Sequence, residues 1–538
     1  MSIVKHSFIF AVGTFLSRIS GLLREMVVSS VFGAGAAMDA FNVAYRIPNL
    51  LRDMLAEGAL SNAFTKVFTE TAEINSQRAK QFLVESLLLI TLIVGTCCLV
   101  GIYFSEAIVT IVANGKFLNP AQKFMTVKLT QVIFPYLLFA SLGALAMGAL
   151  FQRQKFFLSA FAPSVFNMMN IIGAVWFAFL LRHFANIDSK NQWLDIGILG
   201  LAIGVVVGGF FHFAIQWYPL RGALREGIGL GFRIFPLSRE FKKVLKLMFP
   251  MVIATSAGPI NAVINTNFAT SLGTGAVSWL NYAFRLIQLP VGIFAVAIGS
   301  VALPTLVKTI RLSGNQYGEE VARDLAQSLY LVLWLTLPCA IFIFQAALPL
   351  TELLFQQGLF SSRDAIATSQ AMAAYAFCIL GYGVIKVLTS YFYAIDKTIY
   401  PMMVSLICIL LNFLANSFFV QKFQHVGLAV SSSLTLTLNA LLLFLVVWKF
   451  GLKWNLKVVK LRLGSLGICF VVVGIYCFVF GRFNIKIFDT RNLKLQAAWQ
   501  CMWDGAFIAG IFFVGATKAW GISPKQLVAR VRSLRKKR

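Results

Sequence analysis

Acidic residues are scarce in this sequence, and so are charged residues of any kind. Asp and Glu number 20 against 47 Lys and Arg, and charged residues make up only 12% of the 538 positions. A water-soluble chain carries about a quarter charged residues. Because 59% of the residues are hydrophobic and the mean hydropathy is +0.79, too little polar surface remains to cover a soluble core. The composition excludes a soluble protein and indicates a membrane protein.

Motifs for enzymatic chemistry are also missing. The sequence has no GxxxxGK[ST] nucleotide loop, no HExxH motif, no pair of carboxylates at a useful spacing and no catalytic Ser or Cys elbow. These absences argue against ATP hydrolysis and against an enzyme, and no cofactor is expected. The eight cysteines lack metal-ligand spacing and are expected to be small core residues. A Na⁺ gradient or the membrane potential would then have to drive any transport.

The formal net charge of +27 would suggest nucleic acid in a soluble domain, but here the basic residues lie mainly in short loops between apolar runs. Such loops follow the positive-inside rule and face anionic membrane lipid, so nucleic acid is not an expected partner. No signal-peptide cleavage site follows the first apolar run, which is expected to remain as a membrane helix. Both termini are predicted to be cytoplasmic, including the basic tail from Lys525 to Arg538.

Hydropathy predicts an all-α polytopic membrane protein with about fourteen transmembrane helices. They are expected at 7–31, 37–52, 82–112, 124–150, 157–181, 194–218, 247–270, 276–307, 325–348, 368–394, 398–421, 426–448, 461–481 and 498–520. No connection between them is long enough to form a soluble domain.

Ionisable residues inside the predicted helices are the most informative. An Arg at a helix centre costs about 2.5–3.5 kcal/mol on insertion, so such residues usually face a bundle interior or a water-filled cavity. Basic side chains outnumber acidic ones here, and Arg binds phosphate bidentately while staying charged. The set favours an anionic, phosphate-bearing cargo, and it comprises Arg18, Arg24, Glu25, Asp39, Arg46, Arg52, Arg285 and Lys386.

Simpler interpretations exist for part of this set. Arg24, Arg46 and Arg52, and less readily the deeper Arg18 and Arg285, also suit an interfacial anchor that reaches lipid phosphate. Lys386 also suits a structural ion pair. Small residues at Gly13, Ser17 and Gly21 predict a close helix contact in the first span. Pro290 and Pro304 predict a kinked eighth helix.

A long string near the N-terminus resembles the signature of the MurJ (MviN) lipid II flippases, within the group of multidrug, oligosaccharidyl-lipid and polysaccharide exporters. The string is SRISGLLREMVVSSVFGAGAAMDAFNVAYRIPNLLRDMLAEGALSNAF. Further matches are FPYLLFASLGALAMGAL, FAPSVFN, WLNYAFRLIQLPVGIFAVAIGSVALPTL, LFQQGLFSSRDA and KVLTSYFYAIDKT. The resemblance covers essentially the whole chain.

The resemblance implies transport of lipid II, the undecaprenyl-pyrophosphate-linked peptidoglycan precursor, from the cytoplasmic to the periplasmic leaflet of the bacterial inner membrane. It also implies alternating access by two six-helix lobes, 1–220 and 221–448. The remaining segment, 449–538, would add two helices that form a lipid-tail groove and a basic cytoplasmic tail. Lipid II, membrane lipids and cell-wall synthesis proteins are the partners that it implies.

The resemblance also assigns residues. Arg18, Arg24, Arg52 and Arg285 match essential arginines of the family, whereas Asp39 and Glu57 match its acidic positions. Lys386 joins this expected substrate-binding set as an intramembrane cation.

The sequence departs from the family pattern at several positions. Phe284 and Gln288 stand where many relatives have acids beside the helix-eight arginine, and Lys66 stands where relatives often have proline. Some relatives bind sodium through an Asn and an Asp, whereas the matching positions here are Asn412 and Asn416. A sodium site at these two residues is therefore only a hypothesis.

Two other functions fit the sequence less well. One is an exporter of the same fold that carries another lipid-linked oligosaccharide or a drug, although the arginine cluster argues against a drug. The other is a membrane-embedded glycosyltransferase, which would need a carboxylate or metal constellation that the sequence does not offer.

Overall fold

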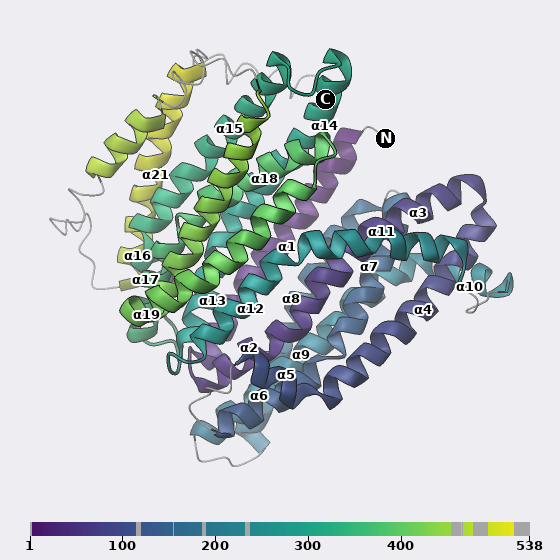
Figure 1. Cartoon of the computed structure of the whole chain (residues 1–538). Coiled ribbons are helices and arrows are strands. Elements are labelled where there is room, and N and C mark those ends of the chain that lie inside the picture. The colour runs from purple at the N-terminus through teal and green to yellow at the C-terminus, as the bar shows by residue number, and fades with distance from the viewer. Residues whose placement is uncertain are drawn as a thin grey trace. The chain divides into compact units, whose positions relative to one another are not determined.

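The computed structural model of the chain describes residues 3–113, 120–153, 155–184, 190–231, 237–452, 464, 466–476 and 493–520. These residues are almost entirely helical and include no strand, as Figure 1 shows. The predicted all-α class is confirmed. The predicted basic tail lies outside the described residues, as does part of the predicted helix at 461–481.

The chain divides into two compact units. The first consists of residues 1–279 together with 355–364. Its helices are α1 (Ile3–Phe32), α2 (Ala36–Leu51), η1 (Arg52–Leu60), α3 (Ser61–Ile74), α4 (Ser76–Tyr103), α5 (Ser105–Val112), α6 (Pro120–Ile133), α7 (Tyr136–Gln152), α8 (Phe156–Phe184), α9 (Lys190–Trp217), η2 (Tyr218–Leu220), α10 (Arg221–Gly229), α11 (Arg239–Thr255) and α12 (Ala257–Ala269).

The second unit consists of residues 280–354 together with 365–538, and its first helix, α13, begins within the first unit. Its elements are α13 (Ala276–Pro290), η3 (Val291–Ala295), α14 (Val296–Ser313), α15 (Glu319–Gln345), α16 (Ala347–Leu354), α17 (Ser362–Tyr375), α18 (Cys378–Ala394), α19 (Ile399–Lys449) and α21 (Leu493–Trp520). A short apolar helix at Leu466–Tyr476 also belongs to it. The division into lobes at residue 220 stays a prediction.

Nine helices within the described residues are long and apolar enough to cross a membrane. They cover most of the predicted spans, and α19 covers two of them because it kinks at Gln424, where φ is 51°. The predicted spans at 7–31, 37–52 and 247–270 are also helical, as α1, α2 and α11–α12, but they are not among these nine. Every predicted span thus overlaps a helix, while the total of about fourteen crossings stays a prediction.

Small residues bring α1 and α8 into close contact in the first unit. A Cβ added to Gly13 would lie 2.7 Å from the Cβ of Ala160, so no larger residue fits without a shift of the helices. The predicted close contact of the first helix is confirmed, and its neighbour is α8. The next pair, α8 and α9, meets in the same way at Gly173 and Gly204. Close backbone approach through small residues is typical of membrane helix pairs.

Two segments wind as π-helices, a form that is rare and frequent at functional sites. The element η1 continues α2 from Arg52 onward, and η3 follows directly after Pro290. The winding changes directly after Pro290, while the kink predicted in the eighth helix stays a prediction. The other proline, Pro304, lies inside α14 without interrupting it.

Candidate functional site

Arg24 on α1 is held by two partners in the first unit. Its Nη1 donates to Oδ1 of Asn167 on α8 at 3.2 Å, and its Nη2 forms an ion pair with the neighbouring Glu25. Asn167 in turn donates to the carbonyl oxygen of Ser17 at 3.3 Å and to Oγ of Ser20 at 3.0 Å. The close contact of α1 with α8 therefore fixes the guanidinium of Arg24.

Arg52 is the first residue of η1, and like Arg24 it binds the acid that follows it and a polar side chain from another helix. Its Nη1 donates to the hydroxyl of Tyr136 at 2.7 Å, while Nε and Nη2 donate to Oδ1 of Asp53 at 3.2 and 2.7 Å. Tyr136 is only 3% exposed and begins α7 directly after Pro135. A Cβ on Gly209 of α9 would lie 2.7 Å from its ring, so this glycine leaves the space that the ring occupies.

The surroundings of the two arginines are connected through Tyr136. Its ring centroid lies 6.0 Å from that of Tyr45 and 5.3 Å from that of Phe166, the neighbour of the Asn167 that holds Arg24. Tyr136 also binds Arg52. The structure therefore brings Arg24 and Arg52 into one cluster, which we call the arginine cluster: Arg24, Glu25, Tyr45, Arg52, Asp53, Tyr136 and Asn167. Arg18 lies six residues before Arg24 on α1 and is exposed.

Asp39 has a different environment from the arginines. Its buried carboxylate accepts hydrogen bonds from the backbone N–H of Gly275 at 2.5 Å and of Ser278 at 2.9 Å, at the start of α13. Gly275 has φ of +98°, a conformation that L side chains rarely adopt. Asp39 thus acts as a side-chain cap from another helix. The other predicted acid, Glu57, lies in η1, and its side chain is outside the described residues.

The predicted cations of the second unit lie on α13 and α18. Arg285 is half-buried on α13, and Lys386 on α18 is exposed. The ring of Phe284, next to Arg285 in the sequence, packs on Tyr375 and Tyr382 with centroids 5.5 and 6.4 Å apart. The residue before Arg285 is therefore held by aromatic packing.

Asn412 and Asn416 lie in a buried, neutral cluster within α19. The Nδ2 of Asn416 donates to Oδ1 of Asn412 at 3.2 Å, and the hydroxyl of Ser431 donates to Oδ1 of Asn416. The Nδ2 of Asn412 contacts Oγ1 of Thr435 at 3.5 Å. Each amide oxygen accepts one hydrogen bond and neither residue carries a charge, and a sodium site at these two residues stays a prediction.

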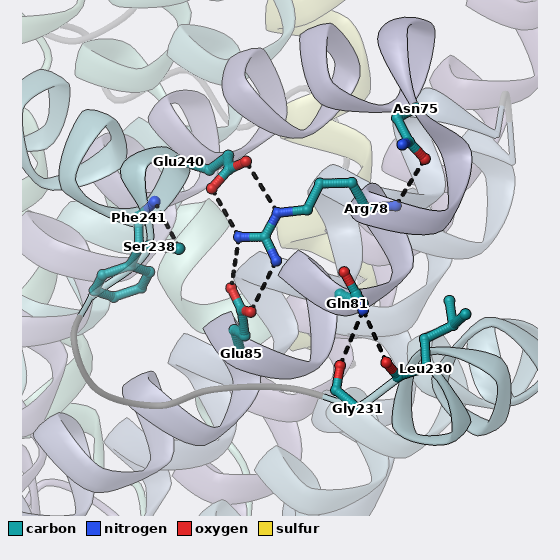
Figure 2. Close-up of polar contacts among 9 residues, drawn as sticks. All are labelled: Asn75, Arg78, Gln81, Glu85, Leu230, Gly231, Ser238, Glu240 and Phe241. Atoms are coloured by element: carbon teal, nitrogen blue, oxygen red, sulfur yellow. Dashed lines mark hydrogen bonds and ion pairs between the residues drawn. The ribbon is translucent and has the colours of Figure 1, made fainter.

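Arg78 on α4 is the centre of an ion-pair cluster that connects α4 to α11. Figure 2 shows its guanidinium between two carboxylates: Glu85 at 2.9 and 3.1 Å, and Glu240 of α11 at 3.0 and 2.8 Å. The hydrogen bonds from Arg78 lower the pKa of Glu240 below its ordinary value. One turn along α4, Nε2 of Gln81 donates to the carbonyl oxygens of Leu230 and Gly231 at 3.0 and 3.1 Å.

Further ion pairs hold α10 and α11 in the first unit. Lys80 on α4 pairs with Glu226 on α10, and Lys243 on α11 pairs with Glu70 on α3 at 2.6 Å. The hydrogen bond from Lys243 lowers the pKa of Glu70. Helices α10 and α11 are thus fastened to α3 and α4, which explains why they belong to the first unit.

Several of these residues were not found by sequence reasoning. Tyr136 and Asn167 lie inside predicted spans, in FPYLLF and FAPSVFN, and they are uncharged. A search restricted to charged residues passes over them. A search for any hydrogen-bonding side chain in an apolar span would have found both, because such groups need partners in the membrane.

Comparisons with known proteins agree along most of the chain. A family model described as Lipid II flippase MurJ matches residues 28–493. A protein of Burkholderia cenocepacia named Lipid II flippase MurJ is 35% identical over 442 residues, which is 82% of either chain. A Buchnera aphidicola protein named Probable lipid II flippase MurJ is 32% identical over 453 residues, which is 82% of this chain and 83% of that protein.

Solved structures share the fold. One described as Lipid II flippase MurJ in an inward closed conformation has 24% identity and a TM-score of 0.74, and the match covers 95% of this chain and 98% of that one. An inward-facing multidrug transporter of the MATE family has 13% identity and a TM-score of 0.66 over 80% and 94% of the two chains. At these identities the likeness shows a common architecture.

Proposed function

Because the chain belongs to the lipid II flippase MurJ family, we propose that it carries lipid II from the cytoplasmic to the periplasmic leaflet of the bacterial inner membrane by alternating access. Lipid II joins its sugar-peptide to its polyprenyl tail through a pyrophosphate. A carrier must therefore accommodate a multiply charged anion and a hydrated headgroup in the membrane. The chain would transport this cargo without changing it chemically, as expected of a protein that is not an enzyme.

The observation that carries the proposal is that Arg52 binds Tyr136, whose ring packs on Phe166 beside the Asn167 that holds Arg24. Guanidinium groups bind phosphate oxygens in pairs and stay charged at any physiological pH. Their helices are fixed by close packing, so the two charges are held in place before cargo arrives. Preorganised charge lowers the cost of binding an anion.

The other predicted residues enter the proposal in supporting roles. Arg18, Arg285 and Lys386 would supply further positive charge for the cargo. Asp39 and Glu57 would position the helices around the site. Membrane lipids surround the protein, both termini would be cytoplasmic, and cell-wall synthesis proteins would receive the cargo.

A flipping assay in reconstituted vesicles tests the proposal. Fluorescent lipid II is placed in one leaflet, and its arrival in the other is followed by quenching. Losing a charge-assisted phosphate contact costs about 1.5–3 kcal/mol, so Arg52→Ala is expected to slow flipping about ten- to a hundredfold. Arg221→Ala is the matched control, because Arg221 lies over the Tyr218 ring, 4.4 Å from its centroid, and outside the arginine cluster.

The same vesicle assay tests which lipid is the cargo. Lipid II is expected to be flipped in preference to another undecaprenyl-linked oligosaccharide. Equal or faster flipping of the other lipid would instead favour the related exporter.

Directionality is proposed to come from the membrane potential, without a cofactor. The neutral Asn412–Asn416 cluster supports the potential over a sodium gradient at this position. Replacing Na⁺ by K⁺ at constant potential is expected to leave the flipping rate unchanged, whereas collapsing the potential is expected to reduce it. A rate that follows the sodium gradient would contradict this part of the proposal.

A further inference from the structure

Each arginine of the arginine cluster is followed directly in the sequence by an acid that neutralises it. Arg24 pairs with Glu25, and Arg52 pairs with Asp53. A phosphate cargo and a carboxylate compete for the same N–H groups of a guanidinium. The cargo can therefore engage an arginine fully only where the resident carboxylate can leave.

The two pairs differ in how easily the carboxylate can leave. The side chains of Arg24 and Glu25 are 14% and 9% exposed, whereas those of Arg52 and Asp53 are 19% and 36% exposed. Breaking a buried pair leaves an uncompensated buried charge, which is strongly unfavourable, whereas an exposed pair contributes little. By this measure Glu25 is a permanent partner and Asp53 is an exchangeable one.

The geometry of Arg52 separates a fixed contact from an exchangeable contact. Its Nη1 faces the buried hydroxyl of Tyr136, while Nε and Nη2, on one edge of the guanidinium, both donate to Oδ1 of Asp53. That edge is one of the two on which a guanidinium can bind two phosphate oxygens side by side. The other oxygen of Asp53 accepts a hydrogen bond from Nδ2 of Asn49 at 3.1 Å. Asn49 thus offers the carboxylate a contact that it can keep when it leaves Arg52.

We propose that Asp53 is a resident counter-ion of Arg52, that cargo pyrophosphate displaces it from the Nε–Nη2 edge, and that Tyr136 holds the guanidinium in place throughout. The inference rests on the proposed function. Asp53 then acts as a specificity-determining residue: a weakly held anion occupies the edge until a doubly bonding one arrives. When cargo leaves, Asp53 returns to the edge, so the empty carrier keeps Arg52 neutralised.

Equilibrium binding of lipid II to the purified full-length protein tests the inference. Asp53→Asn removes the competing charge and is expected to tighten lipid II binding about two- to fivefold, the range set by an exposed ion pair. Asp53→Glu keeps the charge and is expected to bind as the wild type does. Tyr136→Phe removes the fixed contact and is expected to weaken binding severalfold. A merely structural role of Asp53 would make binding weaker in the Asn variant.

Several controls keep the outcome decisive. If Asp53→Asn does not fold, Asp53→Ser removes the same charge with a smaller side chain and carries the same expectation. Glu226→Gln removes a carboxylate from the Lys80 pair, outside the arginine cluster, and is expected to leave the affinity unchanged. Competition by inorganic pyrophosphate is expected to strengthen in Asp53→Asn in parallel with lipid II, since the edge binds the phosphates.

The result separates the two proposals. Wild-type protein that does not bind lipid II overturns the proposed function. Wild-type protein that binds lipid II, together with charge-free Asp53 variants that bind it no more tightly, overturns the counter-ion role alone.

Discussion

The hydroxyl of Ser278 donates a hydrogen bond to Oδ1 of Asp39 at 2.6 Å, although 239 residues separate them in the sequence. The same hydroxyl accepts one from Nδ2 of Asn42 at 3.1 Å. Asp39 and Asn42, three residues apart on α2, therefore hold the first turn of α13 together. A carboxylate at a helix N-terminus is favoured by the partial positive charge of the unpaired N–H groups there.

Removing this carboxylate is expected to destabilise the protein. Asp39→Ala leaves the N–H groups of Gly275 and Ser278 buried without their acceptor, and each such group costs about 1–3 kcal/mol. We expect the free energy of unfolding to fall by at least about 2 kcal/mol, measured by thermal unfolding in detergent. Asp39→Asn keeps one acceptor oxygen and is expected to lose less. Unfolding at the wild-type temperature in the Ala variant would contradict the capping role.

The contact between Asn167 and Arg24 is expected to matter for transport. Asn167→Ala removes the acceptor that orients Nη1 of Arg24, and we expect flipping to slow about three- to tenfold, consistent with one lost hydrogen bond to a charged group. Asn170 on the same helix is the control, because its Nδ2 donates to the carbonyl oxygen of Phe166 and not to an arginine. Asn170→Ala is expected to keep the flipping rate per folded protein. Equal loss in both variants would show that the effect is structural.

Gly209 is expected to act on Arg52 through Tyr136. In Gly209→Ala the new Cβ would overlap the Tyr136 ring, which must move and carry its hydroxyl away from Arg52. We expect slower flipping with nearly unchanged expression, measured in the vesicle assay. Gly95 on α4 has open space around it, so Gly95→Ala should leave transport unchanged and stabilise its helix by up to about 1 kcal/mol. Wild-type flipping by Gly209→Ala would refute the link.

The Arg78 cluster is expected to give a stability that depends on pH. The pKa of Glu240 lies below its ordinary value of 4.5 in the folded protein, because Arg78 donates two hydrogen bonds to it. A lowered folded pKa gives stability that is complete above the ordinary value and is lost as the pH falls through the folded pKa. The difference in unfolding temperature between wild type and Glu240→Gln should therefore be constant at neutral pH and vanish in acid. A difference that does not shrink as the pH falls below 4.5 would contradict this assignment.

Arg78 itself is expected to contribute more than Glu240. The side chain of Glu85 is 4% exposed, so Arg78→Ala leaves a buried carboxylate without its partner. Loss of one member of a buried pair costs about 3–5 kcal/mol. Arg78→Lys keeps the charge but cannot bridge two carboxylates with a planar fork, so its stability should lie between those of the wild type and the Ala variant.

The fold was largely predictable from the sequence, because membrane helices leave a strong apolar signal. The helical class and the approximate spans followed from hydropathy alone, and the glycine at position 13 correctly indicated a close helix contact. The π-helical winding after Arg52 was not predictable, since it depends on packing across helices and not on local composition. The ends of α11 and α12 were also difficult to predict, because polar residues lie within the predicted span 247–270.

The candidate site was predictable only in part. Arginines inside apolar spans can be found from the sequence, and they indicate a site because inserting an unpaired Arg into a membrane is unfavourable. Arg24 and Arg52 do lie in one cluster. Their partners could not be found in the same way. Tyr136 is 84 residues from Arg52, and only the packing of α7 against η1 brings the two together. Asp39 was expected in the substrate-binding set, yet its hydrogen bonds go to the first turn of α13.

The π-helical winding of η1 sets the angular phase between Arg52 and the helix that follows. In an α-helix each residue advances about 100° around the axis, so one residue more or less turns everything beyond it by that angle. The wider π-helical turns of η1 accommodate one additional residue between Arg52 and α3. Arg52 can therefore face Tyr136 while α3 still presents Phe64 and Phe68 to the core of the first unit. A single-residue deletion in this segment would force the chain to give up one of these two orientations.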